Sequence, residues 1–195
     1  GGSYEALGKK YAEYFAKKGV TLELVPTMGA QENIDRLADR KDPVQAAFVQ
    51  AGVRHAKDVK GIQSLGSIGY DPIWFFYRGP ELKNSDLEAH RGSSMHFASK
   101  RISIGVKGSG TYAQATRILE ASGFEHPPQF VYLSGAEAVK ALQDGKIDGA
   151  FIVDSYDAPN VQKLLNDPTL HLLTFNRAEA YVKIIPYLHI LEVPQ

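Results

Sequence analysis

The chain has 195 residues, in which 22 Lys and Arg are balanced by 22 Asp and Glu, so its formal net charge is zero. This balance argues against a nucleic-acid binder and against a protein held on a membrane surface by charge. Hydrophobic residues make up 44% of the chain and charged residues 23%, as in ordinary globular domains, and the absence of cysteine excludes disulfide scaffolds, thiolate zinc sites and cysteine nucleophiles.

Helix-like and strand-like patterns alternate from the start of the chain. Helices are expected at 3–18 and 30–40, where apolar residues recur at spacings of three and four. Strands are expected where the sequence alternates or forms short apolar runs, at 20–25, 46–49, 62–68 and 73–77. The polar, irregular stretch 79–100 follows and is a candidate connection between two lobes.

The same alternation starts again at residue 101. Strands are expected at 101–106, 129–133, 149–153, 171–175 and 187–193, and helices at 111–121, 136–143 and 158–165. Strands that alternate with helices of this length predict an α/β fold with mostly parallel sheets.

An internal repeat indicates how these elements are organised. The helix that opens after Gly2 matches the helix that opens after Gly110, and the turn at Gly29 matches the turn at Gly135. The repeat predicts two similar α/β lobes with a cleft between them. The predicted first lobe comprises 1–78 and about 176–195, the connection 79–100, and the second lobe 101–175. The stretch around 175–187 is also expected to cross between the two lobes.

The two copies of the repeat differ at their beginnings. The second copy has a strand at 102–106 before its glycine turn, whereas the first copy begins at the turn itself. We therefore expect a first lobe that is incomplete at both ends, with a strand before Gly1 and a closing helix after Gln195. Core faces left uncovered in this way are expected to be apolar and exposed.

Glycine-rich turns that open helices are candidate anion sites. Gly108, Ser109, Gly110 and Thr111 lie between a predicted strand and a predicted helix, where free backbone N–H groups and the helix dipole favour anions. Ser109 or Thr111 alternatively serves only to cap the helix. The turn before Ser3 has the same chemistry, and a small anion, most simply a carboxylate, is expected to lie between the two helix starts.

Three further side chains are candidates because they lie at the ends of predicted strands, where open α/β sheets bind ligands. Gln50 ends a strand of the first lobe and can donate a hydrogen bond to a ligand. Asp154 follows the strand 149–153 and either contacts a ligand or caps the next helix. Tyr70 precedes the aromatic strand 73–77 and is a candidate for stacking.

Motifs for other chemistries are incomplete. The loose dinucleotide pattern at 108–113 lacks the acidic residue expected at the end of the next strand. The six histidines show no metal-ligand spacing, and no nucleophile elbow is present. The sequence therefore predicts a binding protein rather than an enzyme, with no cofactor and no metal.

Four motifs, in register along the chain, resemble those of one family. Residues 1–8 are similar to the opening GGxYxxLG of the TAXI-type solute receptors of TRAP transporters, and residues 27–33 are similar to their TxGSxEN. Residues 106–111 resemble their GxxGSGT segment, and residues 144–151 resemble their DGKIDAxF. The resemblance covers the chain from residue 1 to about 193.

This resemblance implies a type II periplasmic-binding fold: two α/β lobes, a hinge and a cleft. It implies that a small organic anion, such as a dicarboxylate or an amino acid, is captured in the periplasm or elsewhere outside the cytoplasm, with any membrane anchor lying outside this chain. The implied partners are the ligand and the membrane permease subunits of a TRAP-type transporter, with no nucleic acid. By position, it places in the cleft Ser3, Tyr4, Thr27, Gly29, Gln50, Ser109, Gly110 and Thr111.

Two other functions use the same kind of fold. The ligand-sensing effector domain of a transcription regulator would be joined to a DNA-binding helix-turn-helix. An enzyme on this scaffold would need a nucleophile, a metal or an acid–base pair, and none stands out in the sequence. Met28, Ala30 and Gln31 depart from the pattern of the TAXI-type receptors, so the resemblance leaves the identity of the ligand open.

Overall fold

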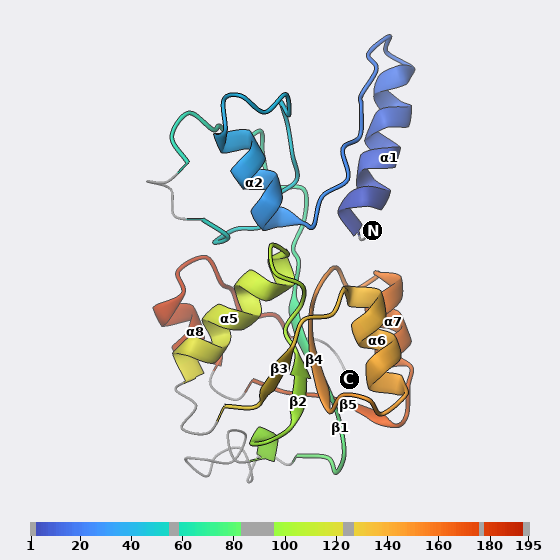
Figure 1. Ribbon diagram of the computed structural model, residues 1–195, viewed down its shortest axis with the longest axis vertical. Helices are drawn as coiled ribbons and strands as arrows, with labels where there is room; N and C mark the ends of the chain where they lie inside the picture. Colours follow the sequence, from blue (N-terminus) through green and yellow to red (C-terminus); the bar gives the residue numbers. More distant parts are fainter. Residues whose placement is uncertain (1–2, 55–58, 83–95, 123–126, 176–177, 193–195) are drawn as a thin grey trace.

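The computed structural model describes residues 3–54, 59–82, 96–122, 127–175 and 178–192. Its strands are β1 (Ile73–Arg78), β2 (Arg101–Ser103), β3 (Gln129–Val131), β4 (Gly149–Val153) and β5 (Leu170–Leu172). Its helices are α1 (Ser3–Ala16), α2 (Ala30–Ala38), α5 (Gly110–Ser122), α6 (Gly135–Gln143), α7 (Pro159–Leu165) and α8 (Ala178–Ile184). The predicted α/β class is confirmed (Figure 1).

The strands form one mixed sheet in the order β3-β2-β4-β1-β5. Strand β2 pairs in parallel with β3 and β4, whereas β1 pairs antiparallel with both β4 and β5. Helices α5, α6 and α7 each connect one strand to the next, β2 to β3, β3 to β4 and β4 to β5. Such crossovers keep successive strands parallel, so β1 alone runs against the other four.

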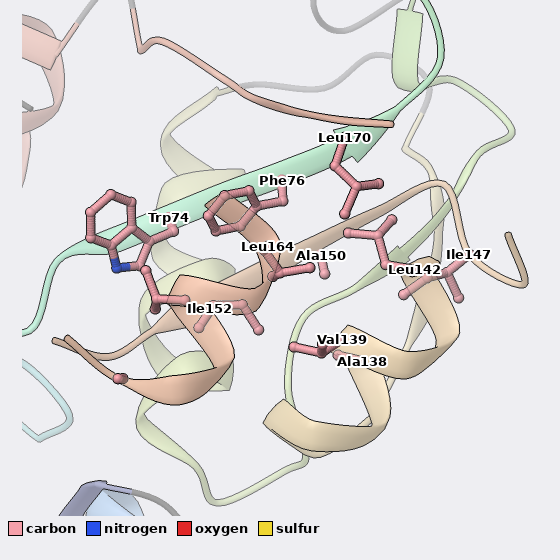
Figure 2. Packing of buried hydrophobic residues seen from close by; sticks show 12 residues of the cluster. Trp74, Phe76, Ala138, Val139, Leu142, Ile147, Ala150, Ile152, Leu164 and Leu170 are labelled. Carbon is pink, nitrogen blue, oxygen red and sulfur yellow. The ribbon is translucent and has the colours of Figure 1, made fainter. Parts of the chain in front are cut away.

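The sheet is covered on both faces, and together with α5, α6, α7 and α8 it forms what we call the sheet lobe (Figure 1). One face packs against α6 and α7 through Trp74 and Phe76 of β1 and Ile152 of β4 (Figure 2). The opposite face packs against α5 and α8 through Phe75 and Tyr77. Because successive side chains of a strand point to opposite faces, β1 contributes large aromatic rings to both cores.

The residues before β1 form a region with a different character, which we call the N-terminal region (3–54 and 59–72). It contains α1 and α2, close to their predicted bounds, and a small core of Ala30, Ile34 and Val53. The strands predicted at 20–25, 46–49 and 62–68 are wrong, because these residues join no sheet in the described structure. A strand requires a neighbouring backbone with which to share hydrogen bonds, and these segments pair with no other strand in the described structure.

Two other expectations are corrected by the sheet. The strand at 73–77 was expected in the first lobe, but it is β1 and lies between β4 and β5. It is apolar on both faces, so only an interior position in a covered sheet buries it fully. The strand expected at 187–193 is not formed over 187–192, the part that the structure describes.

The segments expected to connect the lobes are partly outside the described residues. These are 83–95, within the polar stretch 79–100, and 176–177. Helix α8, which the sequence did not predict, follows 176–177 and packs against the α5 face of the sheet. The division into two lobes with a cleft stays a prediction. None of the described helices is long and apolar enough to cross a membrane.

We expect the buried face of α6 to contribute most to the stability of the sheet lobe. Leu142 has an exposed fraction of 0%, so Leu142→Ala should lower the free energy of unfolding by about 2–5 kcal/mol through lost burial and a cavity. The same substitution at Leu65, which is 97% exposed, should change it by less than about 0.5 kcal/mol. Urea unfolding followed by the fluorescence of Trp74, the single tryptophan, measures both. Equal losses in the two variants would contradict this packing.

Candidate functional site

Two carboxylates meet at one edge of the sheet because β1 runs antiparallel to β4. In this register Ile73 lies opposite Val153, so the residues just before β1 lie beside those just after β4. Asp71 precedes β1 by two residues, and Asp154 follows β4 directly. The indole N–H of Trp74 donates to the backbone carbonyl of Asp154 (2.9 Å), which fixes the end of β4 against the start of β1.

Side chains from the N-terminal region complete a polar cluster around these two carboxylates. The Tyr4 hydroxyl and the Gln50 Nε2 both donate to Asp71 Oδ2, at 3.1 and 2.8 Å. The Asp154 carboxylate accepts hydrogen bonds from the side chain of Ser3 and from the backbone N–H of Ser155. We call Ser3, Tyr4, Gln50, Asp71 and Asp154 the Asp71–Asp154 cluster.

The electrostatics of this cluster disfavour negative charge. Burial raises the pKa of Asp154, and the nearby charge of Asp71 raises it further, although the hydrogen bonds from Ser3 and Ser155 act in the opposite direction. The pKa of the Tyr4 hydroxyl is also raised, first by burial and then by Asp71. Among the described residues, no Lys or Arg forms an ion pair with either carboxylate. The cluster is therefore a place where a cation is favoured.

The start of α5 lies at the same edge of the sheet. The Ser109 hydroxyl accepts from the N–H of Tyr112 (3.1 Å), and the Thr111 hydroxyl accepts from the N–H of Val153 at the end of β4 (3.3 Å). Both hydroxyls therefore already have protein partners. The backbone N–H groups of Gly110 and Thr111, in contrast, donate to no other described residue, so they remain available as the donors of a helix start.

The N-terminal region touches this turn directly. The first backbone N–H groups of α2, from Gln31 and Glu32, donate to the carbonyl of Gly108 at 3.1 and 3.4 Å. Gly29, at φ 134°, lies so close that a Cβ there would be 3.1 Å from the Cα of Ser109. Glycine is needed at position 29 both for this conformation and for this approach. These N–H groups at the start of α2 thus already have an acceptor within the protein and are not open to an anion.

A second close contact joins the cluster to α5. The amide group of Gln50 packs against Gly110, where the Cβ of any other residue would overlap Gln50 Oε1. Gln50 Oε1 is buried and has no hydrogen-bond partner among the described residues. Gln50 therefore links Asp71, through its Nε2, to the first residue of α5.

The structure gathers most of the residues predicted as ligand contacts, although whether they contact a ligand stays a prediction. Ser3, Tyr4, Gln50 and Asp154 belong to the cluster. Five lie where the glycine turns meet: Gly29, Gly108, Ser109, Gly110 and Thr111.

The side chains of two predicted positions form no hydrogen bond, ion pair or ring contact with the other predicted residues in the described structure, and one residue was missed. The Thr27 hydroxyl bonds to the side chain of Asn33 within the N-terminal region, and Tyr70 is 82% exposed without a hydrogen bond or ring contact among the described residues. Sequence reasoning overlooked Asp71, because only the antiparallel pairing of β1 places it beside Asp154. The described residues contain no group of His, Cys, Asp and Glu that could hold a metal ion.

Comparison with known proteins identifies the family. The model of the NMT1-like family matches residues 1–190, so the chain belongs to this family. No curated protein matches the sequence significantly.

Two solved structures are similar to the chain at low sequence identity. The periplasmic aliphatic sulphonate binding protein SsuA from Escherichia coli is 19% identical; the match covers 60% of this chain and 42% of SsuA, with a TM-score of 0.39. The amino acid ABC transporter substrate-binding protein AbpA from Streptococcus pneumoniae, solved with L-arginine, is 18% identical, with 84% of this chain and 61% of AbpA covered and a TM-score of 0.47. The chain spans less than two thirds of either protein, and neither likeness indicates a ligand.

We expect Gly110→Ala to disrupt the contact between the N-terminal region and α5. The new methyl group must displace Gln50, which should lower the free energy of unfolding by about 1–3 kcal/mol. A Gln50→Ala background removes the amide that the new methyl group would overlap, so there Gly110→Ala should lower the free energy of unfolding much less. Urea unfolding of the wild type, the two single variants and the double variant gives the coupling energy. Gly69→Ala is the control, since a Cβ there meets nothing within 4 Å. Strictly additive effects at positions 50 and 110 would refute the contact.

Asp154 should make stability fall as the pH rises. Its folded-state pKa is raised above the ordinary value of 3.8, mainly by burial, so the unfolded state loses its proton first. As the pH rises from 3.8 to the raised pKa, the free energy of unfolding should decline. At pH values above both pKa values, it should stay at this lower level. Asp154→Asn cannot ionise and should be increasingly stable relative to the wild type across this window. Parallel stability curves for the two proteins would show that Asp154 titrates normally.

Proposed function

We propose that this member of the NMT1-like family is a solute-binding protein that captures a small organic ion outside the cytoplasm and presents it to a membrane transporter. The single observation that carries the proposal is the Asp71–Asp154 cluster beside the start of α5. There, two carboxylates without a cationic partner in the described structure lie next to backbone N–H groups that have no acceptor.

An amino acid fits this arrangement better than a dicarboxylate. Its ammonium group carries three donors and a positive charge, which suit Asp71 and Asp154. Its carboxylate suits the free N–H groups of Gly110 and Thr111 and the positive end of the α5 dipole. A dicarboxylate would bring a second negative charge towards two acidic residues, which costs free energy.

The transporter is proposed to be of the TRAP type. The support is the four motifs that resemble TAXI-type receptors, two of which, at 27–33 and 106–111, form the glycine turns that meet in the structure. On this proposal the partners are the permease subunits of such a transporter, and the protein works in the periplasm or on the outer side of the cytoplasmic membrane.

Ligands that differ by one charged group test the class of solute. We expect at least one L-amino acid of a panel of the twenty to stabilise the protein by about 2.7 kcal/mol at a concentration of 100 times its dissociation constant. The analogue that lacks only the ammonium group, such as 4-methylpentanoate for L-leucine, should stabilise it far less. Thermal unfolding and titration calorimetry measure both.

A matched pair of variants assigns the binding to the cluster. Asp154→Asn removes the negative charge beside Asp71 and should weaken amino-acid binding by about tenfold or more, the loss of a charge-assisted hydrogen bond. Asp144→Asn removes a carboxylate that pairs with Lys140 and Lys146 on the surface and should leave binding unchanged. Tighter binding of the analogue without the ammonium group than of the amino acid itself would overturn the ligand class, and a panel without any stabilising solute, dicarboxylates included, would overturn the proposed function.

A further inference from the structure

The amide of Gln50 is held in an orientation that is unfavourable for an isolated side chain. Its Nε2 donates to Asp71 Oδ2 at 2.8 Å, and only the amide nitrogen can face a carboxylate, because the amide oxygen accepts and cannot donate. The oxygen, Oε1, is therefore turned towards Gly110, where it is buried without a hydrogen-bond partner among the described residues. A buried acceptor without a donor costs free energy, so other contacts must keep Gln50 in this place.

The backbone on both sides of Gln50 is held by side chains rather than by strand pairing. Before it, the carbonyl of Phe48 accepts from Asn33 Nδ2 at 2.8 Å, within the N-terminal region. After it, the carbonyl of Ala51 accepts from Gln114 Nε2 at 2.7 Å, across the junction with α5. The second hydrogen bond ties the residue next to Gln50 to the sheet lobe.

Gln114 is itself oriented by a residue of the segment that follows α8. Gln114 is 4% exposed, and both polar atoms of its amide have partners: Nε2 donates to Ala51, and Oε1 accepts from the Tyr187 hydroxyl at 3.0 Å. Since the carbonyl of Ala51 only accepts, Nε2 must face it, and Oε1 must face Tyr187. Burial raises the pKa of Tyr187, so its hydroxyl stays protonated and remains a donor.

The Tyr187 ring is fixed by neighbours of its own. It lies on the backbone of Gly52, where the Cβ of any other residue would be 2.0 Å from Tyr187 Cζ, and the φ of 76° at this position also favours glycine. The guanidinium carbon of Arg117 lies 5.6 Å from the ring centroid, at cation–π distance. Helix α8, which precedes Tyr187, lies beside α5 (Figure 1). The ring therefore joins the segment after α8 both to α5 and to the turn that follows Gln50.

We propose that Tyr187 and Gln114 are positioning residues of the candidate site. Through the backbone next to Gln50, they hold its amide between the Asp71–Asp154 cluster and the start of α5, although neither residue belongs to the cluster. They thereby keep in place a hydrogen-bond donor that offsets part of the repulsion between the two carboxylates. The affinity for a solute then depends on a segment of the chain far from the cluster in sequence, a consequence that rests on the proposed function.

Two tyrosines, one on α8 and one after it, place their hydroxyls on α5 and form a matched pair. Tyr187→Phe removes the hydroxyl that bonds to Gln114 and keeps the ring. Tyr181→Phe removes the hydroxyl that pairs with Ser122 at 2.8 Å, at the other end of α5. Both variants lose one part-buried hydrogen bond to α5, but only the first loses one that leads to the site.

The side-chain amide of Gln50 reports its own position without any solute. Its NH₂ protons, assigned by NMR from their absence in the Gln50→Ala protein, should exchange with solvent about tenfold faster or more in Tyr187→Phe, because Nε2 is no longer held to Asp71. In Tyr181→Phe the exchange should stay within about twofold of the wild type. The side-chain amide of Asn33, which bonds within the N-terminal region, is the internal control and should not change in either variant.

Binding is measured with the panel of the twenty L-amino acids. For each one that stabilises the wild type, titration calorimetry should show about threefold to tenfold weaker binding to Tyr187→Phe, the effect of one lost hydrogen bond. Tyr181→Phe should bind within about twofold of the wild type. Added to Gln50→Ala, Tyr187→Phe should weaken binding no further, since the residue through which it acts is already absent.

Unchanged exchange of the Gln50 amide in Tyr187→Phe would overturn the proposal, as would unchanged affinity, or an equal loss of affinity with and without Gln50. If Tyr187→Phe does not fold, Gln114→Met keeps the length of the side chain and removes both of its hydrogen bonds, so it should give the same faster exchange, and unchanged exchange there would overturn the proposal. If no amino acid of the panel binds the wild type, the proposed function fails, and the exchange of the Gln50 amide alone decides whether Tyr187 positions it.

Discussion

The reversed strand β1 is the constraint on which the rest of the structure depends. Its aromatic side chains alternate between the two faces of the sheet, so the packing of α6 and α7 on one side and of α5 and α8 on the other both require it. A strand that is apolar on both faces is stable only when both faces are covered, which places β1 in the interior, between β4 and β5. Its direction also decides the chemistry of the site, because a parallel β1 would carry Asp71 to the opposite edge of the sheet, away from Asp154.

The junction between the N-terminal region and the sheet lobe is made by backbone rather than by large side chains. The start of α2 donates to the carbonyl of Gly108, Gly29 touches Ser109, and Gln50 fills the space that a side chain at Gly110 would take. Contacts of this kind tolerate little displacement, because adding a single methyl group at either glycine forces the opposing atoms apart. The junction therefore fixes the distance between the cluster and the free N–H groups of α5.

The Asp71–Asp154 cluster keeps two carboxylates close together and partly buried, which is unfavourable for an isolated fold. Hydrogen bonds from Tyr4, Gln50, Ser3 and Ser155 offset part of the cost, but burial still raises the pKa of Asp154. Groups whose ionisation is perturbed in this way occur frequently at functional sites. A bound ammonium group would relieve the repulsion, since it favours the charged form of both carboxylates.

Local features of the sequence determined the helices α1, α2, α5, α6 and α7 and the strand β4, which was predicted at 149–153 and lies at Gly149–Val153. Apolar periodicity and glycine turns act over a few residues, so they are visible without the fold. Tertiary structure alone decided the direction of β1 and the approach of Asp71 to Asp154, because pairing register relates residues about eighty positions apart. It also decided that 20–25 and 46–49, with the composition of strands, are not strands: a helix satisfies its own backbone, whereas a strand needs a neighbour.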